Sequence, residues 1–520
     1  MKNAMPDNST SQSRNRRVML VSMYGIENRG VRYISAVLRQ AGFEPHLVLF
    51  KRWVNNRIRP PTECEAQLLA GLARKINPLL IGFGFGSPYF KIVRDLTDML
   101  RAATPAPMLW GGIHPTVCPE ECIAHADFVC VGEGEFAALE LCRALEEGRD
   151  PGGIPGLWSR RGPETRPGPA RALLEDLDSL PYPDYMQANT VFIEDNRASE
   201  IDPIAQTVEY RIYPTRGCPY NCSYCYNSTL KNMYKGLGRY YRIRGVDGVI
   251  GELRHALRLF PRTRRVKFDG DVFAFPKPWL RDFCAAYARD IGVPFEILTY
   301  PGELDEEDLR ALRRAGLDKI QTGIQSGSDR EVSAVYGRRS TCSDIRELSR
   351  VARRAGVGIV FDLIFDNPLA TPEDKRAMIE LLLELERPFK IYLYSLTVFP
   401  KTAIARELIE RGIITADGVE GRATKSFSQF RLSFDYPRPP EDVYWISLAI
   451  LSSKSFIPRR LIRALLNSEH FRRNPGALKF AARLSDLAKT VAIALGMLAR
   501  GELTRFKIRQ YGTMGQIISQ

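Results

Sequence analysis

The segment Arg216-Gly-Cys-Pro-Tyr-Asn-Cys-Ser-Tyr-Cys-Tyr226 places three cysteines, Cys218, Cys222 and Cys225, in a C-x3-C-x2-C spacing on one short loop. Thiolates this close together indicate a metal site, and sulfur ligands select zinc, copper(I) or an iron–sulfur cluster. A structural zinc site takes a fourth cysteine or histidine at a similar short spacing, and none follows nearby. A [4Fe–4S] cluster held by three cysteines keeps one iron open, so we predict such a cluster. A structural zinc loop or a disulfide cluster is the alternative.

With the aromatic residue Tyr224 directly before the last cysteine, this spacing resembles the signature of the radical S-adenosylmethionine (SAM) enzymes. The resemblance implies that the amino and carboxylate groups of SAM chelate the open iron. Electron transfer then cleaves SAM to methionine and a 5′-deoxyadenosyl radical. It also implies an external electron donor such as flavodoxin or ferredoxin.

The length and composition of the chain indicate a globular enzyme with several domains. A chain of 520 residues suggests about three domains of roughly 150 residues, and a hydrophobic content of 44% is ample for buried cores. The seven cysteines outside the loop are scattered without a disulfide framework, and the amino terminus lacks the apolar core of a signal peptide. We therefore predict a cytoplasmic protein.

The first large domain is predicted at residues 17–160, after a polar, disordered tail at residues 1–16. Short apolar runs alternate there with helical patterns, which favours an α/β fold with a doubly wound, Rossmann-like parallel sheet. Ligands of such sheets bind beyond the carboxyl ends of the strands. Glycines follow three of the predicted strands, where they permit tight turns and close approach of the backbone to a ligand. A nucleotide site is the competing interpretation.

The motifs Gly-Gly-Ile-His-Pro-Thr and Val-Gly-Glu-Gly-Glu, placed before a radical SAM cysteine loop, resemble the cobalamin-binding subclass of that family. The resemblance implies cobalamin contacts at Gly84, Gly86, Gly111, Gly112, His114, Gly132, Glu133, Gly134 and Glu135. The chain departs from the classical cobalamin domains because it lacks their Asp-x-His-x-x-Gly loop. We therefore expect cobalamin to bind base-off without a histidine ligand, and His114 to hydrogen-bond the backbone and fix a loop.

A linker is predicted at residues 161–205, followed by a partial (β/α)6 radical SAM barrel at residues 206–420. The first barrel strand delivers the cysteine loop at its carboxyl end, where barrel enzymes place their catalytic groups. The six predicted strands lie at residues 210–213, 266–269, 295–298, 319–323, 358–364 and 390–394.

The resemblance also implies which barrel residues contact SAM. These are Asp269, Gly270 and Asp271 near the SAM ammonium, Gln325 and Ser326 near its ribose and carboxylate, and Tyr224 beside the cluster and adenine. Gln325 stands where the family most often has glutamate, and either aspartate could instead cap the next turn. No catalytic residue is assigned.

The last predicted domain, at residues 421–520, is helical and basic, with 17 Lys and Arg against 6 Asp and Glu. It contains no recognisable nucleic-acid module, so no nucleic-acid partner is expected. Its apolar run at residues 491–499 is shorter than the roughly 20 residues of a membrane span. Three readings stay open: an amphipathic element touching an anionic membrane, a lid over the active site, or a helix packed on the barrel.

Together these resemblances imply a cobalamin-dependent radical SAM methyltransferase. The deoxyadenosyl radical would remove hydrogen from an unactivated carbon of a small-molecule, natural-product or lipid-like substrate, and methylcobalamin would supply the methyl group. A cyclase, oxidase or rearranging enzyme with the same cofactors is the first alternative. A non-catalytic iron–sulfur redox or sensor module is the second.

Overall fold

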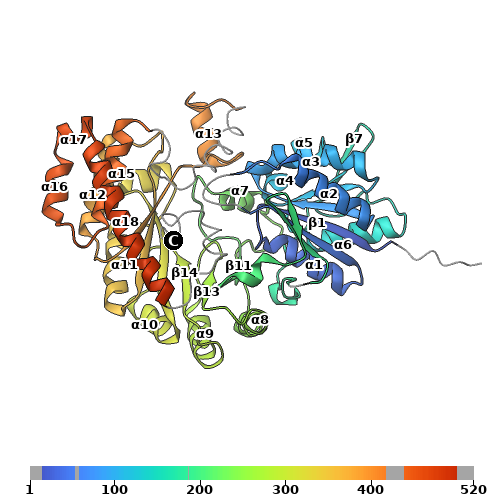
Figure 1. Cartoon of the computed structure of the whole chain (residues 1–520), viewed down its shortest axis with the longest axis horizontal. Helices are drawn as coiled ribbons and strands as arrows, with labels where there is room; N and C mark the ends of the chain where they lie inside the picture. Colours follow the sequence, from blue (N-terminus) through green and yellow to red (C-terminus); the bar gives the residue numbers. More distant parts are fainter. Residues whose placement is uncertain (1–14, 53–57, 186, 417–437, 500–520) are drawn as a thin grey trace, which may run out of the picture.

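The computed structural model describes residues 15–52, 58–185, 187–416 and 438–499. The chain forms two parts, each built around one sheet, which are joined by segments coloured green in Figure 1. Helices from the carboxyl-terminal part of the chain cover the side of the second part that lies away from the first (Figure 1). The predicted fold class is confirmed: a Rossmann-like sheet precedes a partial barrel of six parallel strands.

The amino-terminal sheet has the strand order β7-β6-β5-β4-β3-β1-β2-β8-β9. Neighbouring strands from β5 to β8 are parallel, and the outer pairs are antiparallel. The strands are β1 (Arg17–Met23), β2 (Glu44–Phe50), β3 (Leu80–Gly84), β4 (Met108–Gly111), β5 (Phe128–Cys130), β6 (Leu157–Arg161), β7 (Glu164–Pro167), β8 (Thr190–Glu194) and β9 (Arg197–Ser199). The helices are α1 (Arg29–Gln40), α2 (Glu63–Ile76), α3 (Phe90–Ala103), α4 (Ile113–Val117), α5 (Pro119–Ile123) and α6 (Gly134–Glu146).

Strand β1 shows why this sheet is covered on both faces. Val18 and Leu20 belong to one hydrophobic core, while Met19 and Val21 belong to another. Successive side chains of a strand point to opposite faces, so a continuous apolar run fills both cores. The apolar run of β1 is therefore continuous because helices cover both faces of the sheet.

The segment expected to be a linker, residues 161–205, instead contributes β7, β8 and β9 to the edges of this sheet. Strand β7 is largely exposed and β9 likewise. Short edge strands with one or both faces in solvent carry few apolar residues, so they lack the hydrophobic run that marks an interior strand.

The second sheet has the order β10-β13-β14-β15-β16-β17, and all of its neighbouring strands are parallel. Its strands are β10 (Glu209–Ile212), β13 (Arg265–Phe268), β14 (Phe295–Thr299), β15 (Leu317–Gln325), β16 (Gly358–Ile364) and β17 (Lys390–Tyr394). A short antiparallel pair, β11 (Thr215–Arg216) and β12 (Arg242–Ile243), flanks the cysteine loop. The helices are α7 (Tyr226–Met233), α8 (Val246–Leu259), α9 (Lys277–Asp290), α10 (Glu306–Ala315), α11 (Cys342–Ala355), α12 (Pro372–Glu384) and α13 (Ala403–Glu410).

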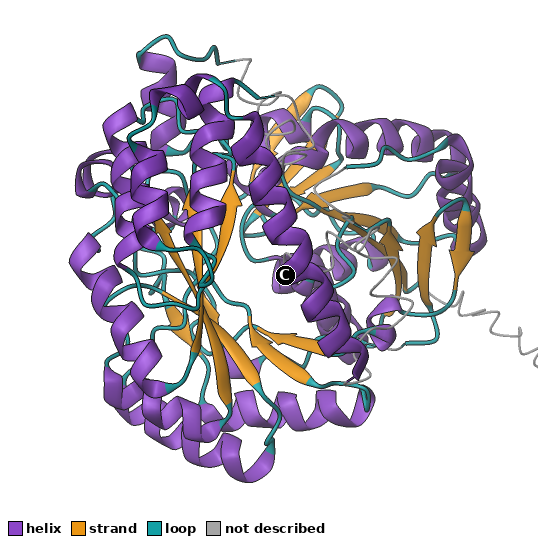
Figure 2. Cartoon of the chain, turned by 60° about the vertical axis from the view of Figure 1, so that its left-hand side comes forward, coloured by secondary structure: helices purple, strands orange, loops and turns teal. Residues whose placement is uncertain are grey.

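The carboxyl-terminal helices stack on the flank of the barrel (Figures 1 and 2). They are α15 (Pro440–Ser452), α16 (Arg459–Leu466), α17 (Glu469–Arg473) and α18 (Gly476–Ala499). Tyr444, Trp445 and Leu448 of α15 are buried in the core of the barrel. Helix α15 is thus a structural part of the barrel, and removing it would expose that core.

Candidate cofactor and substrate site

A cavity of about 740 Å³ lies between the two sheets and is lined by residues of both. The amino-terminal sheet contributes Gly112 and Gly132, which follow the carboxyl ends of β4 and β5. The barrel contributes residues from the cysteine loop and from the ends of its strands. Among these barrel residues are Arg216, Tyr224, Cys225, Tyr226, Asn227, Arg242, Asp271, Gln325 and Asp362.

The cysteine loop is held in place by its backbone. Gly217, directly before Cys218, has φ +76°, and a Cβ there would lie 2.3 Å from the carbonyl oxygen of Tyr240. Only glycine fits both constraints. The Ser223 N–H donates to the Tyr336 carbonyl at 2.9 Å, and the Ser223 carbonyl accepts from the N–H of Ile404 at 3.1 Å. The loop is therefore positioned by segments distant in the sequence.

The three thiols of this loop suit a cluster better than a single ion. All ten cysteines are free of disulfides, and Cys218, Cys222 and Cys225 do not all lie within 4.8 Å of one another. A tetrahedral zinc ion with Zn–S bonds of about 2.3 Å needs sulfur atoms about 3.8 Å apart. Burial raises the pKa of the Cys225 thiol to about 11, and because a metal ligand must be deprotonated, metal binding at this thiol would release a proton. The donor set fits a [4Fe–4S] cluster.

Arg338 is a buried cation next to the cysteine loop. Its Nη1 lies 3.7 Å from Cys222 Sγ and 3.2 Å from the hydroxyl of Tyr224. Its Nη2 donates to the Gly323 carbonyl at 2.6 Å, and its guanidinium lies 4.3 Å from the centre of the Tyr300 ring. Sequence reasoning missed this residue, because no local motif connects it to a loop more than one hundred residues earlier.

We expect replacement of Arg338 by glutamine to make the reduction potential of the cluster more negative. The guanidinium offsets negative charge at the cluster sulfurs, and a charge-assisted hydrogen bond is worth about 1.5–3 kcal/mol, roughly 60–130 mV for one electron. EPR-monitored redox titration measures the shift. Arg330→Gln is the control, because Arg330 is half-exposed and pairs with Asp374. Equal potentials in both variants would remove this role for Arg338.

Asp271 and Gln325 are the predicted SAM residues that the structure brings to the cavity together with Tyr224. Burial raises the pKa of the Asp271 carboxyl, whose side chain interacts with Asn227. The same Asn227 side chain lies 3.7 Å from Cys225 Sγ and accepts a hydrogen bond from the Tyr240 hydroxyl at 2.6 Å. Asn227, which sequence reasoning also missed, thereby ties the carboxylate to the cluster loop.

The backbone of Gln325 is unusual, because this residue has φ +63°. A non-glycine residue in the left-handed region costs free energy and is found often at functional sites. Its neighbour Ser326 is fully buried, and its hydroxyl accepts from the N–H of Ser328 at 3.1 Å. Gln325 therefore faces the cavity at a point where the strand bends, and Ser326 supports that bend.

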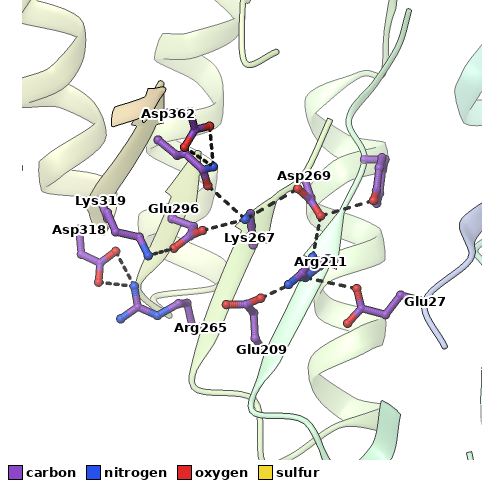
Figure 3. Close-up of polar contacts among 12 residues, drawn as sticks. Glu27, Glu209, Arg211, Arg265, Lys267, Asp269, Glu296, Asp318, Lys319 and Asp362 are labelled. Carbon is purple, nitrogen blue, oxygen red and sulfur yellow. Dashed lines mark hydrogen bonds and ion pairs between the residues drawn. The ribbon is translucent and has the colours of Figure 1, made fainter. Parts of the chain in front are cut away.

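Asp269 and Gly270 lie outside the cavity lining. Figure 3 shows Asp269 facing Arg211 and Lys267 across the barrel interior, at 3.0 and 3.9 Å. The network continues to Glu296, where Lys267 and Lys319 outweigh the effect of burial and lower the pKa of the carboxyl to about 2. With these partners, Asp269 belongs to the polar network of the barrel interior, whereas Asp271 is the aspartate that lines the cavity.

Of the predicted cobalamin contacts, Gly112, Gly132 and Glu133 line the cavity. Gly112 has φ +105°, and a Cβ there would lie 2.5 Å from the Phe85 carbonyl oxygen. A Cβ on Gly132, at φ +102°, would lie 2.1 Å from the hydroxyl of Tyr234, which also lines the cavity. The predicted contacts that do not line it are Gly84, Gly86, Gly111, His114, Gly134 and Glu135.

Glu133 and Glu135 form ion pairs with arginines beside the cysteine loop. Glu133 accepts from Arg216 at 3.1 Å and binds Arg242 through both carboxylate oxygens at 2.9 and 3.0 Å. Glu135 accepts from Arg216 at 2.5 Å. The pKa of the Glu133 carboxyl is lowered overall, because the effect of Arg242 and Arg216 exceeds the opposing effect of burial. These pairs fix the amino-terminal sheet against the cluster loop.

His114 is fully buried and takes part in a hydrogen-bonded chain between the domains. Its Nδ1 lies 2.8 Å from Ser87 Oγ, which lies 2.6 Å from the hydroxyl of Tyr226. Its Nε2 faces Glu121 at 3.5 Å. Burial lowers the pKa of His114 to about 4, so the ring is neutral at pH 7.

We expect His114→Ala to retain cobalamin, with an affinity reduced by no more than about tenfold, the lower end of effects on supporting residues. The EPR spectrum of the cobalt(II) form of the wild type should show no nitrogen hyperfine splitting from the protein. A splitting that disappears in His114→Ala would identify His114 as a cobalt ligand and contradict this expectation.

Comparisons with known proteins agree with this two-part architecture. A profile of the B12 binding domain matches residues 16–141, and a profile of the radical SAM superfamily matches residues 212–384. An uncharacterized methyltransferase of Pyrococcus horikoshii is 26% identical over 69% of this chain and 78% of its own length. The tryptophan 2-C-methyltransferase of Streptomyces laurentii is 23% identical over 74% of this chain and 73% of its own.

The chain is also similar to enzymes with other products and to solved structures. An anaerobic magnesium-protoporphyrin IX monomethyl ester cyclase of Rubrivivax gelatinosus is 27% identical over 50% of this chain and 46% of its own. The structure of the methyltransferase TsrM of Kitasatospora setae, with cobalamin and a [4Fe–4S] cluster bound, superposes with a TM-score of 0.60 at 17% identity. That superposition covers 91% of this chain and all of the other.

Proposed function

Because the chain is a radical SAM enzyme with an amino-terminal cobalamin-binding domain, whose cofactors are a [4Fe–4S] cluster, SAM and cobalamin, we propose that it methylates an unactivated carbon of a small molecule. Two relatives that match about seven tenths of the chain are methyltransferases.

One observation carries this proposal: a single cavity is lined by Cys225 and by the glycine-rich strand ends at Gly112 and Gly132. A methyl donor and a radical initiator must face the same substrate carbon for a methyl group to replace hydrogen. When bound, the cluster with SAM supplies a carbon-centred radical and cobalamin supplies the methyl group. The two predicted cofactor regions open into one space, which is the arrangement this reaction requires.

The protein residues have positioning roles in this proposal. Cys218, Cys222 and Cys225 hold the cluster, and Asp271 and Gln325 orient SAM. Glu133 clamps Arg216 and Arg242 and so sets the spacing between the two cofactor regions. The largely apolar walls exclude water, which protects a reactive radical from side reactions.

The cavity walls indicate the class of substrate. Aromatic and aliphatic side chains dominate the barrel side, namely Tyr224, Tyr226, Leu230, Tyr234, Tyr240, Ile364, Tyr394, Leu396 and Phe399. Asp362 adds one carboxylate, which Gln321 contacts at 2.8 and 3.1 Å. We propose a largely apolar or aromatic molecule with a polar group that reaches this carboxylate.

An anaerobic assay tests the proposed reaction. The reconstituted enzyme is incubated with cobalamin, reductant, cell extract and SAM carrying a deuterated methyl group. We expect 5′-deoxyadenosine and a product that has gained a deuterated methyl group. Formation of 5′-deoxyadenosine with a product that lacks the label would contradict methyl transfer and favour the second candidate below.

The second candidate is a cyclase or oxidase that uses the same cofactors without methyl transfer. The similarity to the Rubrivivax gelatinosus cyclase favours it, although that match covers only half of this chain. We rank it below methyl transfer because the methyltransferase relatives match more of the chain. A cytoplasmic setting and an external donor such as flavodoxin or ferredoxin belong to the proposal in either case.

A further inference from the structure

Helix α18 exposes an apolar stripe on the side that faces away from the barrel. Its exposed apolar residues are Phe480, Leu484, Leu487, Val491, Leu495 and Leu498, with exposed fractions from 46 to 69%. At 100° per residue these six positions fall within an arc of about 80°, along about 27 Å of helix. Such a continuous apolar face marks an interaction surface.

The opposite face of the same helix is packed in its amino-terminal part. Leu478 and Ala482 belong to the core of the barrel, and Ser485 is buried. Lys454, itself buried, pairs with Asp486 and fastens the helix to the segment after α15. Between residues 478 and 486 this packing leaves the stripe facing outward, and turning the stripe inward would lose those contacts.

Exposed apolar side chains are concentrated in this part of the molecule. Among the described residues, eight of the thirteen exposed large hydrophobic side chains lie between residues 456 and 498. Helix α16, on the same flank in Figure 1, exposes Leu461 together with Arg460 and Arg463. Phe456 is 69% exposed just before that helix.

The charges around the stripe favour an anionic partner. Helix α18 carries Lys479 and Arg483 on the side next to one edge of the stripe, and its acidic residue Asp486 pairs with Lys454. Pairing with a second copy of the chain would bring the basic side chains of the two copies close together, whereas an anionic surface attracts them. No helix within the described residues has the length and apolarity needed to cross a bilayer, so the helix would lie in the plane of the surface.

We propose that the stripe on α18 docks the protein on an anionic lipid surface. The leucines enter the boundary between head groups and acyl chains, and the flanking lysine and arginine contact the lipid phosphates. This proposal does not depend on which reaction the enzyme catalyses. It accounts for why a helix packed on the barrel keeps six apolar side chains in solvent.

The test uses the full-length protein and vesicles of phosphatidylcholine mixed with phosphatidylglycerol. The double variant Leu484→Asp and Leu487→Asp places charge on the stripe. Ile201→Asp with Ile409→Asp is the matched control, since both isoleucines are exposed far along the chain from α18. We expect co-sedimentation of wild type and control at low salt, weaker binding at high salt, and affinity lower by roughly tenfold or more for the stripe variant.

Other outcomes would overturn the proposal. These are wild type that stays in the supernatant, a stripe variant that binds as well as the control, and equal binding to pure phosphatidylcholine vesicles. A wild-type dimer in light scattering that only the stripe variant dissociates would assign the stripe to a second copy. Unchanged SAM cleavage without vesicles in both variants shows that the fold is intact.

Discussion

Replacing Cys225 with alanine is expected to abolish both the cluster and the cleavage of SAM. Cys225 is one of three thiols in a loop whose backbone is fixed by Gly217 and Ser223, so no other cysteine can take its place. Loss of one of three ligands should lower retention of iron by more than about 100-fold, since even supporting residues cost 10–100-fold. Iron content, the visible absorption band and 5′-deoxyadenosine formation measure the result.

Cys284→Ala is the matched control, because Cys284 is also half-buried but lies on helix α9, outside the cysteine loop. It should retain iron and SAM cleavage. Stoichiometric zinc in the anaerobically prepared wild type, without SAM cleavage, would contradict the cluster assignment. Iron retained in Cys225→Ala would show that this cysteine is not a ligand.

Replacing Arg242 with methionine is expected to reduce product formation strongly while SAM cleavage continues. Arg242 is buried and binds both carboxylate oxygens of Glu133, which lines the cavity from the amino-terminal sheet. A displacement of about 1 Å between reacting groups costs about 100-fold in rate. We therefore expect product formation to fall by about 100-fold, while iron content and product-independent SAM cleavage change only a few-fold.

Arg265→Met is the control, and it tests whether the loss of any ion-paired arginine separates SAM cleavage from product formation. Arg265 makes two contacts with Asp318 on the barrel alone, at 2.6 and 2.9 Å. Loss of this pair should lower the melting temperature without uncoupling SAM cleavage from product formation. If Arg242→Met loses its cluster, or if Arg265→Met uncouples equally, the role of Arg242 is general stability and the alignment hypothesis fails.

Much of the architecture could be read from local patterns. All six barrel strands were predicted within a few residues. Apolar residues recur along each of them, almost continuously in β16 and alternating with polar residues in β10 and β13. Strands β7, β8 and β9 were missed inside an expected linker, and β7 and β9 are short, exposed edge strands with few apolar residues. The cysteine loop was visible because its three cysteines lie within eight residues of the sequence.

The sequence by itself determined the position of the cysteine loop, the order of the two domains and the basic character of the carboxyl-terminal part, because each is encoded within a short stretch of residues. Only the tertiary structure decided which of the two neighbouring aspartates faces the cavity, Asp271 rather than Asp269. It also placed Arg338 beside Cys222 and paired Glu133 with Arg242. These contacts join residues about one hundred positions apart, and their distances follow from the packing of whole sheets, which no local pattern specifies.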